Sequence, residues 1–277
     1  MGGILGMRGE GVLDVSATAT AARGRGYAWD GVLLYVPPAL RNARHSHFPA
    51  LLQVALEKPF CLTLDDGTHG HHEVAVMAPS LPHATDTQGH PFLDILVDPD
   101  DDLYRYLHPL LDGAPLRSLP LQGIAHLLPQ AAALREEGVS AVQAHDFLLR
   151  LLRTLCPQPL ERLPWDERTL RACAYMRSSI REAVPTVAQV AAHVGLSQSR
   201  LMHLFSEDLG LPMRQYLLWL RLRHALRLAG EGRTLTGIAL GAGFYDHAHF
   251  NRTMRRMVEF APSVLNASTV MIYGGSA

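Results

Sequence analysis

The stretch TVAQVAAHVGL, residues 186–196, recurs in pattern 48 residues later as TLTGIALGAGF, residues 234–244. Each copy opens with a Thr whose hydroxyl group can cap the N-terminus of a helix. Each copy also places a small residue, Ala191 or Ala239, four positions before a Gly. This spacing lets a second helix cross closely over the first, and the Gly supplies the left-handed turn between them. The repeat therefore predicts two helix-turn-helix units in one chain.

A polar run after each Gly predicts the second helix of each unit, beginning near Ser197 in the first copy and near Asp246 in the second. Residues 213–229, between the two units, predict one long connecting helix. Four apolar residues at helical spacing are expected to face the core of these units: Leu201, Phe205, Phe250 and Met254.

The last predicted helix carries a pattern that resembles a metal site. The segment GFYDHAHFNRTMRR, residues 243–256, contains His247-Ala-His249, which is spelled like a chelating His-x-His pair. On a helix, residues two apart are separated by about 200° around the axis, so the two imidazoles cannot close on one ion. Three Arg fall in the last five residues, which is typical of an element that contacts phosphates. We therefore expect a nucleic-acid contact and no metal in this segment.

The composition is that of a globular protein, with 48% apolar and 18% charged residues in a chain of 277. That length suffices for two domains with separate cores. The chain has no run of about eighteen apolar residues, so no membrane span is predicted. The first residues lack the pattern of a signal peptide. The three cysteines have no CxxC spacing and are typical of reduced packing residues. We expect a cytoplasmic protein with no membrane partner.

Charge divides the chain unevenly, although the formal net charge is only −1. Residues 166–277 hold thirteen Arg and eight Asp or Glu, whereas residues 1–165 hold twelve basic and eighteen acidic side chains. A basic C-terminal part behind an acidic N-terminal part suggests a nucleic-acid-binding module joined to a second domain.

The domain boundary is expected at residues 156–165, CPQPLERLPW, where three prolines predict an extended linker. The preceding residues 1–155 predict a compact β-domain, a sandwich or a small barrel, and residues 166–277 predict helices. The β-prediction rests on short apolar runs between Gly, Pro and Asp turns, at residues 31–36, 60–64 and 92–97.

Residues 140–155 predict a helix that is apolar over most of its circumference. Two interpretations stay open. The helix packs on the β-domain of its own chain, or it forms a dimer interface.

With these features the C-terminal part resembles the AraC/XylS family of bacterial transcription regulators over about residues 166–266. The resemblance rests on residues in both units and in the helix between them: Val190-Ala191, Gly195-Leu-Ser197, Arg200-Leu201, Phe205, Leu220-Arg-Leu-Arg223-His-Ala225, Ile238-Ala239, Gly243-Phe244 and Phe250-Asn-Arg252. One departure lies at residues 258–266, VEFAPSVLN, where Glu259 and Asn266 replace the Gly and the Arg of the family's usual ending.

The resemblance implies a regulator, not an enzyme, that binds double-stranded DNA, forms a homodimer and has RNA polymerase as a further partner. Two short helices would read base edges in successive segments of the major groove. The residues that match base-reading positions are Gln198, Ser199, Met202 and His203 in the first unit and His247, Ala248, His249 and Arg252 in the second. Three further residues fit phosphate contacts: Arg200, Arg255 and Arg256.

The N-terminal part resembles the cupin-type sensing domain that often accompanies such a module, on the basis of HSH at residues 45–47 and MAPSLPH at residues 77–83. The expected fold is therefore α+β, with a cupin-like β-barrel or sandwich and its helices followed by an all-α domain of two helix-turn-helix units. The resemblance implies a pocket for a small-molecule effector, for which the candidate residues are His45, His47, Gln53 and His83.

A metal site in the β-domain is the alternative to an organic pocket. Residues two apart on a strand point to one face, so His45 and His47, joined by His83, could ligate one ion. The Glu that cupin enzymes carry shortly after their His-x-His is absent, so we expect an organic effector, no metal and no cofactor. The rival function is a metal-dependent cupin enzyme with a helical interaction tail. The chain has no nucleophile elbow and no glycine-rich phosphate loop.

Two polar clusters are interpreted as surface features. Residues 69–73, HGHHE, predict an exposed hairpin tip. Residues 98–102, DPDDD, predict a solvated turn because they lack the ligand alternation of a calcium loop.

Overall fold

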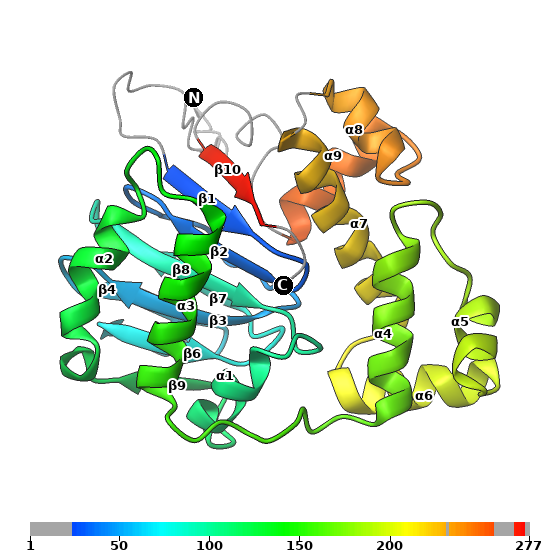
Figure 1. Ribbon diagram of the computed structural model, residues 1–277, viewed down its shortest axis with the longest axis horizontal. Helices are drawn as coiled ribbons and strands as arrows, with labels where there is room; N and C mark the ends of the chain where they lie inside the picture. The colour runs from blue at the N-terminus through cyan, green and yellow to red at the C-terminus, as the bar shows by residue number, and fades with distance from the viewer. Residues whose placement is uncertain (1–23, 231–232, 258–268, 275–277) are drawn as a thin grey trace, which may run out of the picture.

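The computed structural model describes residues 24–230, 233–257 and 269–274. A β-rich half lies beside a helical half, and the two halves are in contact (Figure 1). The expectations for the start of the chain and for residues 258–266 lie outside the described residues. Among the described helices, none is both long and apolar enough to cross a membrane.

The strands of the β-rich half form two sheets. The larger sheet has the strand order β10-β1-β2-β8-β3-β6-β9 and the smaller sheet the order β5-β4-β7. All pairings are antiparallel except that of β1 with β10. The bounds are β1 Gly24–Ala28, β2 Val32–Val36, β3 Ala50–Ala55, β4 Phe60–Leu64, β5 His69–His72, β6 Val74–Met77, β7 His83–Asp86, β8 Phe92–Val97, β9 Leu116–Leu119 and β10 Thr269–Tyr273.

Strand β3 shows why the two layers form. All of its residues are buried, because one face meets the small sheet and the other meets helices. Leu51 belongs to the same apolar cluster as Phe60 and Leu62 of β4, whereas Leu52 belongs to the cluster that contains Phe147 of α3. A strand covered on both faces reads as a continuous apolar run. The predicted α+β fold with a β-sandwich is confirmed.

The helices fall into two groups. Those of the β-rich half are α1 Tyr104–Leu111, η1 Leu121–Gly123, η2 Ala125–Leu127, α2 Leu128–Ala133 and α3 Ala141–Leu155, and Figure 1 shows α2 and α3 across the outer face of the large sheet. Those of the helical half are α4 Glu167–Ser179, α5 Val187–Val194, α6 Gln198–Leu209, α7 Met213–Gly230, α8 Leu235–Gly241 and α9 His247–Met257.

Helix α3 buries its apolar stripe in its own chain. Ser140 caps it in a capping box with Gln143. The stripe that faces the sheet is Ala144, Phe147, Leu148, Leu151 and Leu152. Most of the opposite face is polar, with Val142 as an exception at 70% exposed. The helix prediction is confirmed, but the apolar surface is narrower than expected, so it does not itself point to a dimer interface.

Two expectations about the ends of elements need correction. Residues 69–72 are strand β5, paired with β4, and not the tip of the hairpin. Residues 269–273, within the range assigned to the helical domain, form β10 and extend the sheet of the other half by pairing with β1. The division into residues 1–155, a linker and residues 166–277 therefore stays a prediction, and its last range includes a strand of the β-rich half.

Candidate DNA interface and histidine cluster

The first helix-turn-helix unit consists of α5 and α6. Thr186 accepts a hydrogen bond from the backbone N–H of Gln189 at 3.3 Å and forms a capping box with its side chain. Gly195 ends α5 with a φ of +72°, a conformation that costs other residues energy. Ser197 then caps α6 by accepting a hydrogen bond from the backbone N–H of Arg200. The local chemistry of the predicted turn is confirmed.

The second unit, α8 and α9, repeats this construction. Thr234 accepts a hydrogen bond from the N–H of Gly237 at 3.2 Å, and Gly243 has a φ of +76°. Asp246 caps α9 by accepting a hydrogen bond from the N–H of His249 at 2.6 Å. All four residues expected to face the core are 0% exposed: Leu201, Phe205, Phe250 and Met254. The long connecting helix between the units is α7.

The outward face of α6 carries the four residues proposed to read bases. Gln198, Ser199, Met202 and His203 are all exposed, and Met202 is 47% exposed although it is apolar. His203 Nε2 lies 3.2 Å from a carboxylate oxygen of Glu207, one turn further along the helix. An acid therefore stands beside one of the proposed reading residues.

The outward face of α9 is less open. Ala248 and Arg252 are exposed, whereas His247 and His249 are half-buried. The His249 ring meets Phe244 edge-on at 5.5 Å, and His247 lies 3.2 Å from the side-chain amide of Asn251. Each of the two histidines therefore contacts a different side chain of its own helix-turn-helix unit.

The proposed phosphate contacts are only partly described. Arg200 lies exposed on α6. Arg255 and Arg256 belong to α9, but their side chains lie outside the described part of the structure.

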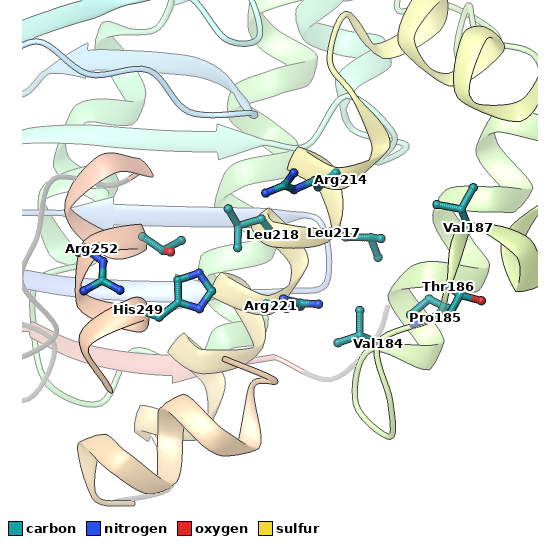
Figure 2. Close-up of a pocket in the computed structure, with 11 residues that line it drawn as sticks. Val184, Pro185, Thr186, Val187, Arg214, Leu217, Leu218, Arg221, His249 and Arg252 are labelled. Carbon is teal, nitrogen blue, oxygen red and sulfur yellow. The ribbon is translucent and has the colours of Figure 1, made fainter. Parts of the chain in front are cut away.

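A basic cleft of about 820 Å³ lies between α7, α9 and the segment before α5. Figure 2 shows Arg214 and Arg221 of α7 in its wall, with His249 and Arg252 of α9 to one side. Within the described residues, the buried Nε of Arg221 has no hydrogen-bond partner, and burial lowers the pKa of this side chain. A cleft wall of several guanidinium groups favours an anion such as a phosphate.

The turn at residues 98–102 joins the two halves, contrary to expectation. Asp98 is 0% exposed, and its carboxylate accepts hydrogen bonds from Trp219 Nε1 at 3.0 Å and from Arg223 Nη1 at 2.9 Å, both on α7. Arg223 also donates to the carbonyl oxygens of Trp29 and Val32. Burial raises the pKa of Asp98, and the guanidinium groups oppose that rise.

Asp100 makes the second half of this contact. It accepts hydrogen bonds from Arg177 of α4 and from the hydroxyl group of Tyr216 of α7, the latter at 2.7 Å. Beside it, the indole N–H of Trp165 donates to the carbonyl oxygen of Pro99 at 2.7 Å. The prediction of a solvated turn is wrong, because donors on α4 and α7, remote in sequence, cover these carboxylates. We define Asp98, Asp100, Arg177, Tyr216, Trp219 and Arg223 as the interdomain cluster.

The three histidines proposed for the effector pocket lie together in the β-rich half. Their ring centroids are separated by 4.7 Å (His45 and His83), 5.3 Å (His45 and His47) and 5.4 Å (His47 and His83). His47 and His83 are buried, and His45 is half-buried. Burial lowers the pKa of all three, that of His83 to about 4, so the rings are neutral at pH 7.

Gln53, the fourth proposed pocket residue, belongs to a different polar group. Its amide nitrogen donates to Asp94 Oδ1 at 3.0 Å, and its oxygen accepts from the Thr85 hydroxyl group at 3.4 Å. Burial raises the pKa of Asp94 to about 7. Sequence reasoning missed Asp94, because a single Asp inside an apolar strand, FLDILV, gives no signal of its partner.

Tyr245, which was not among the predicted site residues, precedes the cap of α9 and is 87% exposed. An exposed aromatic side chain between two helices of a reading unit is a candidate contact. The signal was its place in the polar run after Gly243.

Comparison with known proteins finds sequence similarity over the helical half. A family described as a helix-turn-helix domain matches residues 190–268. The arabinose operon regulatory protein of Escherichia coli (strain K12) is 31% identical over 105 residues, which are 38% of this chain and 36% of that protein. The chain thus spans about a third of the length of this relative.

Most of the chain has the fold of a solved structure. ToxT from Vibrio cholerae O395 is 14% identical, with a TM-score of 0.54 over 85% of this chain and 96% of that one. Unsaturated fatty acid bound wild-type ToxT from Vibrio cholerae strain SCE256 is 13% identical, with a TM-score of 0.58 over 86% and 95%. At this identity the likeness concerns the fold, whereas the sequence match concerns the helical half. The two sequence matches support the resemblance of the helical half to the AraC/XylS family.

Proposed function

We propose that this protein is a sequence-specific DNA-binding transcription regulator controlled by a small molecule bound in its β-rich half. The observation that carries the proposal is the second helix of each unit, since α6 and α9 share caps and turns and present polar side chains outward. A small exposed helix held at its N-terminus by a crossing partner is the geometry that enters a major groove.

Base reading is assigned to the outward faces of the two helices. The first face holds Gln198, Ser199, Met202 and His203, and the second holds His247, Ala248, His249 and Arg252. Arg252 is the one cation among these residues that is always charged, and Arg is the commonest reader of guanine edges. The second unit should therefore contribute more base discrimination. Arg200, Arg255, Arg256 and the basic cleft would hold phosphates.

Effector control is supported by the fold and by the position of the polar groups. One ToxT structure of this fold is described as bound to an unsaturated fatty acid. In this chain the histidines and the Gln53–Asp94 pair supply polar groups for a small ligand. Phe48, next to His47, meets the ring of Tyr216 edge-on at 5.2 Å, so the ligand region adjoins the interdomain cluster.

A homodimer is part of the proposal, but α3 would meet its partner through a mostly polar face. A shallow depression of about 620 Å³ on α2 and α3 is bordered by Gln143, Asp146, Arg150 and Arg153. Such an interface would be wet and salt-dependent.

The Arg252→Ala variant is expected to bind its preferred sequence about 10- to 100-fold more weakly, a loss of about 1–3 kcal/mol, and to lose preference at one or two positions. The preferred sequence is first obtained by selecting bound duplexes from a random pool with the full chain. Wild type and variant are then titrated against that duplex and a scrambled one at several salt concentrations.

Arg200→Ala is the matched control, because it also removes one exposed Arg. It should weaken binding to both duplexes alike and reduce the salt slope by about one. An unchanged sequence preference in Arg252→Ala would show that the reading face is assigned incorrectly. A full chain that selects no sequence would refute the proposed function.

A further inference from the structure

We propose that His45, His47 and His83 hold one divalent first-row transition-metal ion, with a coordination position left for an exogenous ligand. One ligand nitrogen from each ring lies within 4.8 Å of those from the other two. Within the described residues, this is the group of His, Cys, Asp and Glu side chains whose ligand atoms converge in this way. The inference goes beyond the proposed function and reverses the expectation of a metal-free pocket.

The spacing of the rings fits a shared ion. With a metal–nitrogen distance of about 2.0–2.1 Å and near-tetrahedral angles, three imidazole centroids lie about 5 Å apart. The observed centroid distances are 4.7, 5.3 and 5.4 Å, and the rings are tilted by 51° to 73°, so none is stacked on another. Rings tilted in this way leave one nitrogen of each within 4.8 Å of those of the other two, which is the arrangement that binding of one ion requires.

Hydrogen bonds already orient two of the rings as metal ligands require. His83 Nδ1 lies 2.9 Å from the carbonyl oxygen of Leu81, and His45 Nδ1 lies 3.1 Å from that of Ala43. A carbonyl oxygen only accepts, so His83 Nδ1 carries the proton and its Nε2 carries the lone pair in the neutral ring. Ligating histidines almost always donate their other N–H to such a group. The Nε2 atom of His83 is buried and lacks a hydrogen-bond partner in the described structure.

The backbone holds the cluster together from two separate segments. The N–H and C=O groups of His45 and His83 exchange hydrogen bonds at 3.0 and 2.9 Å. His47 is held in turn by its carbonyl oxygen, which accepts from the N–H of Ser80 at 3.0 Å. A site fixed at both segments requires little rearrangement when the ion binds. Three imidazole ligands suit zinc, iron, nickel or copper and leave room for a water molecule or a donor atom from a ligand.

The test uses the full chain, freed of metal with a chelator and titrated with zinc in competition with a chromophoric chelator. We expect one tight site per chain. His83→Gln and His45→Gln should each weaken it by more than about 100-fold, since even outer-shell partners of a metal site contribute about 10- to 100-fold. His71→Gln is the matched control, because it removes an exposed histidine from β5 and should leave the tight site unchanged. Cobalt added instead of zinc should give visible d–d absorption that both cluster variants alter.

Far-UV circular dichroism establishes that each variant is folded, and His45, which is half-buried, is the substitution that the fold tolerates better. Wild type without a tight site, or a tight site of equal affinity in His45→Gln and His83→Gln, would overturn the inference. Binding to the selected duplex is measured in separate samples with and without zinc. Because the zinc titration contains no DNA, a failure of the proposed function leaves its result intact.

Discussion

Asp98→Ala is expected to lower the free energy of unfolding by about 3–5 kcal/mol, because it removes one partner of a buried ion pair. The carboxylate is 0% exposed and accepts hydrogen bonds from Arg223 and Trp219. Its loss leaves Arg223, whose side chain is only 13% exposed, without its charge partner at the junction of the two halves. Trp219 Nε1 loses its acceptor at the same time.

The measurement is urea unfolding of the full chain, followed by tryptophan fluorescence and far-UV circular dichroism. Asp102→Ala is the matched control in the same turn, because Asp102 is 74% exposed and pairs only with Arg105 at 3.3 Å among the described residues. It should change stability by less than about 1 kcal/mol. If Asp98→Ala and Asp102→Ala were equally stable, the hydrogen bonds of Asp98 would contribute nothing to the coupling of the halves.

The free energy of unfolding of the wild-type protein, minus that of Asp94→Asn, is expected to fall by at most about 4 kcal/mol between pH 4 and pH 7. Burial raises the pKa of Asp94 to about 7 in the folded protein, whereas an unfolded chain has an Asp pKa near 4. Between these values the folded protein keeps a proton that the unfolded chain has released. Stability from this group is therefore complete below pH 4 and is lost as the pH rises through 7.

Asp94→Asn keeps an acceptor for Gln53 but removes the titration, so the difference between the two proteins isolates this side chain. Unfolding free energies are measured at intervals from pH 4.5 to pH 8 for both. Burial lowers the pKa values of His47 and His83, so these side chains make stability rise with pH. Both proteins contain them, and their contribution cancels in the difference. Parallel profiles for the two proteins would mean that Asp94 is ionised in the folded state at neutral pH.

The helical half could be predicted from sequence because its determinants are local. A cap such as Thr186 and a turn such as Gly195 act on residues within one helical turn, and their chemistry is readable in a short window. The second unit repeats the same cap and turn residues. The two units could therefore be compared with each other, which a single unit does not allow. The inward positions of Phe205 and Phe250 followed from helical spacing alone.

The interdomain cluster could not be predicted in the same way. Asp98 and Arg223 are separated by 125 residues, and nothing in DPDDD indicates that a tryptophan and an arginine of another domain cover it. Strand β10 poses the same difficulty, because its partner β1 lies at the opposite end of the described chain. Both contacts join segments that are remote in sequence, so they depend on how the folded parts of the chain pack against each other.

The histidine cluster could be predicted in part from the sequence. The spacing of His45 and His47 suggested convergence, but His45 forms an isolated bridge with His83 and neither residue lies on a named strand. The absence of a following Glu argued against a metal. The unpartnered Nε2 of His83 is visible only in three dimensions, and it changes that interpretation.

If α6 and α9 read two separate segments of one DNA site, as we propose, the base preference at each position of the selected duplex will depend on one helix or the other. Two double variants of the full chain are compared with wild type: Gln198→Ala with His203→Ala on α6, and His249→Ala with Arg252→Ala on α9. We predict that each relaxes preference in its own segment, with the two segments about one helical turn, or about 34 Å, apart. Loss of preference in the same segment from both variants, or in neither, would contradict the claim.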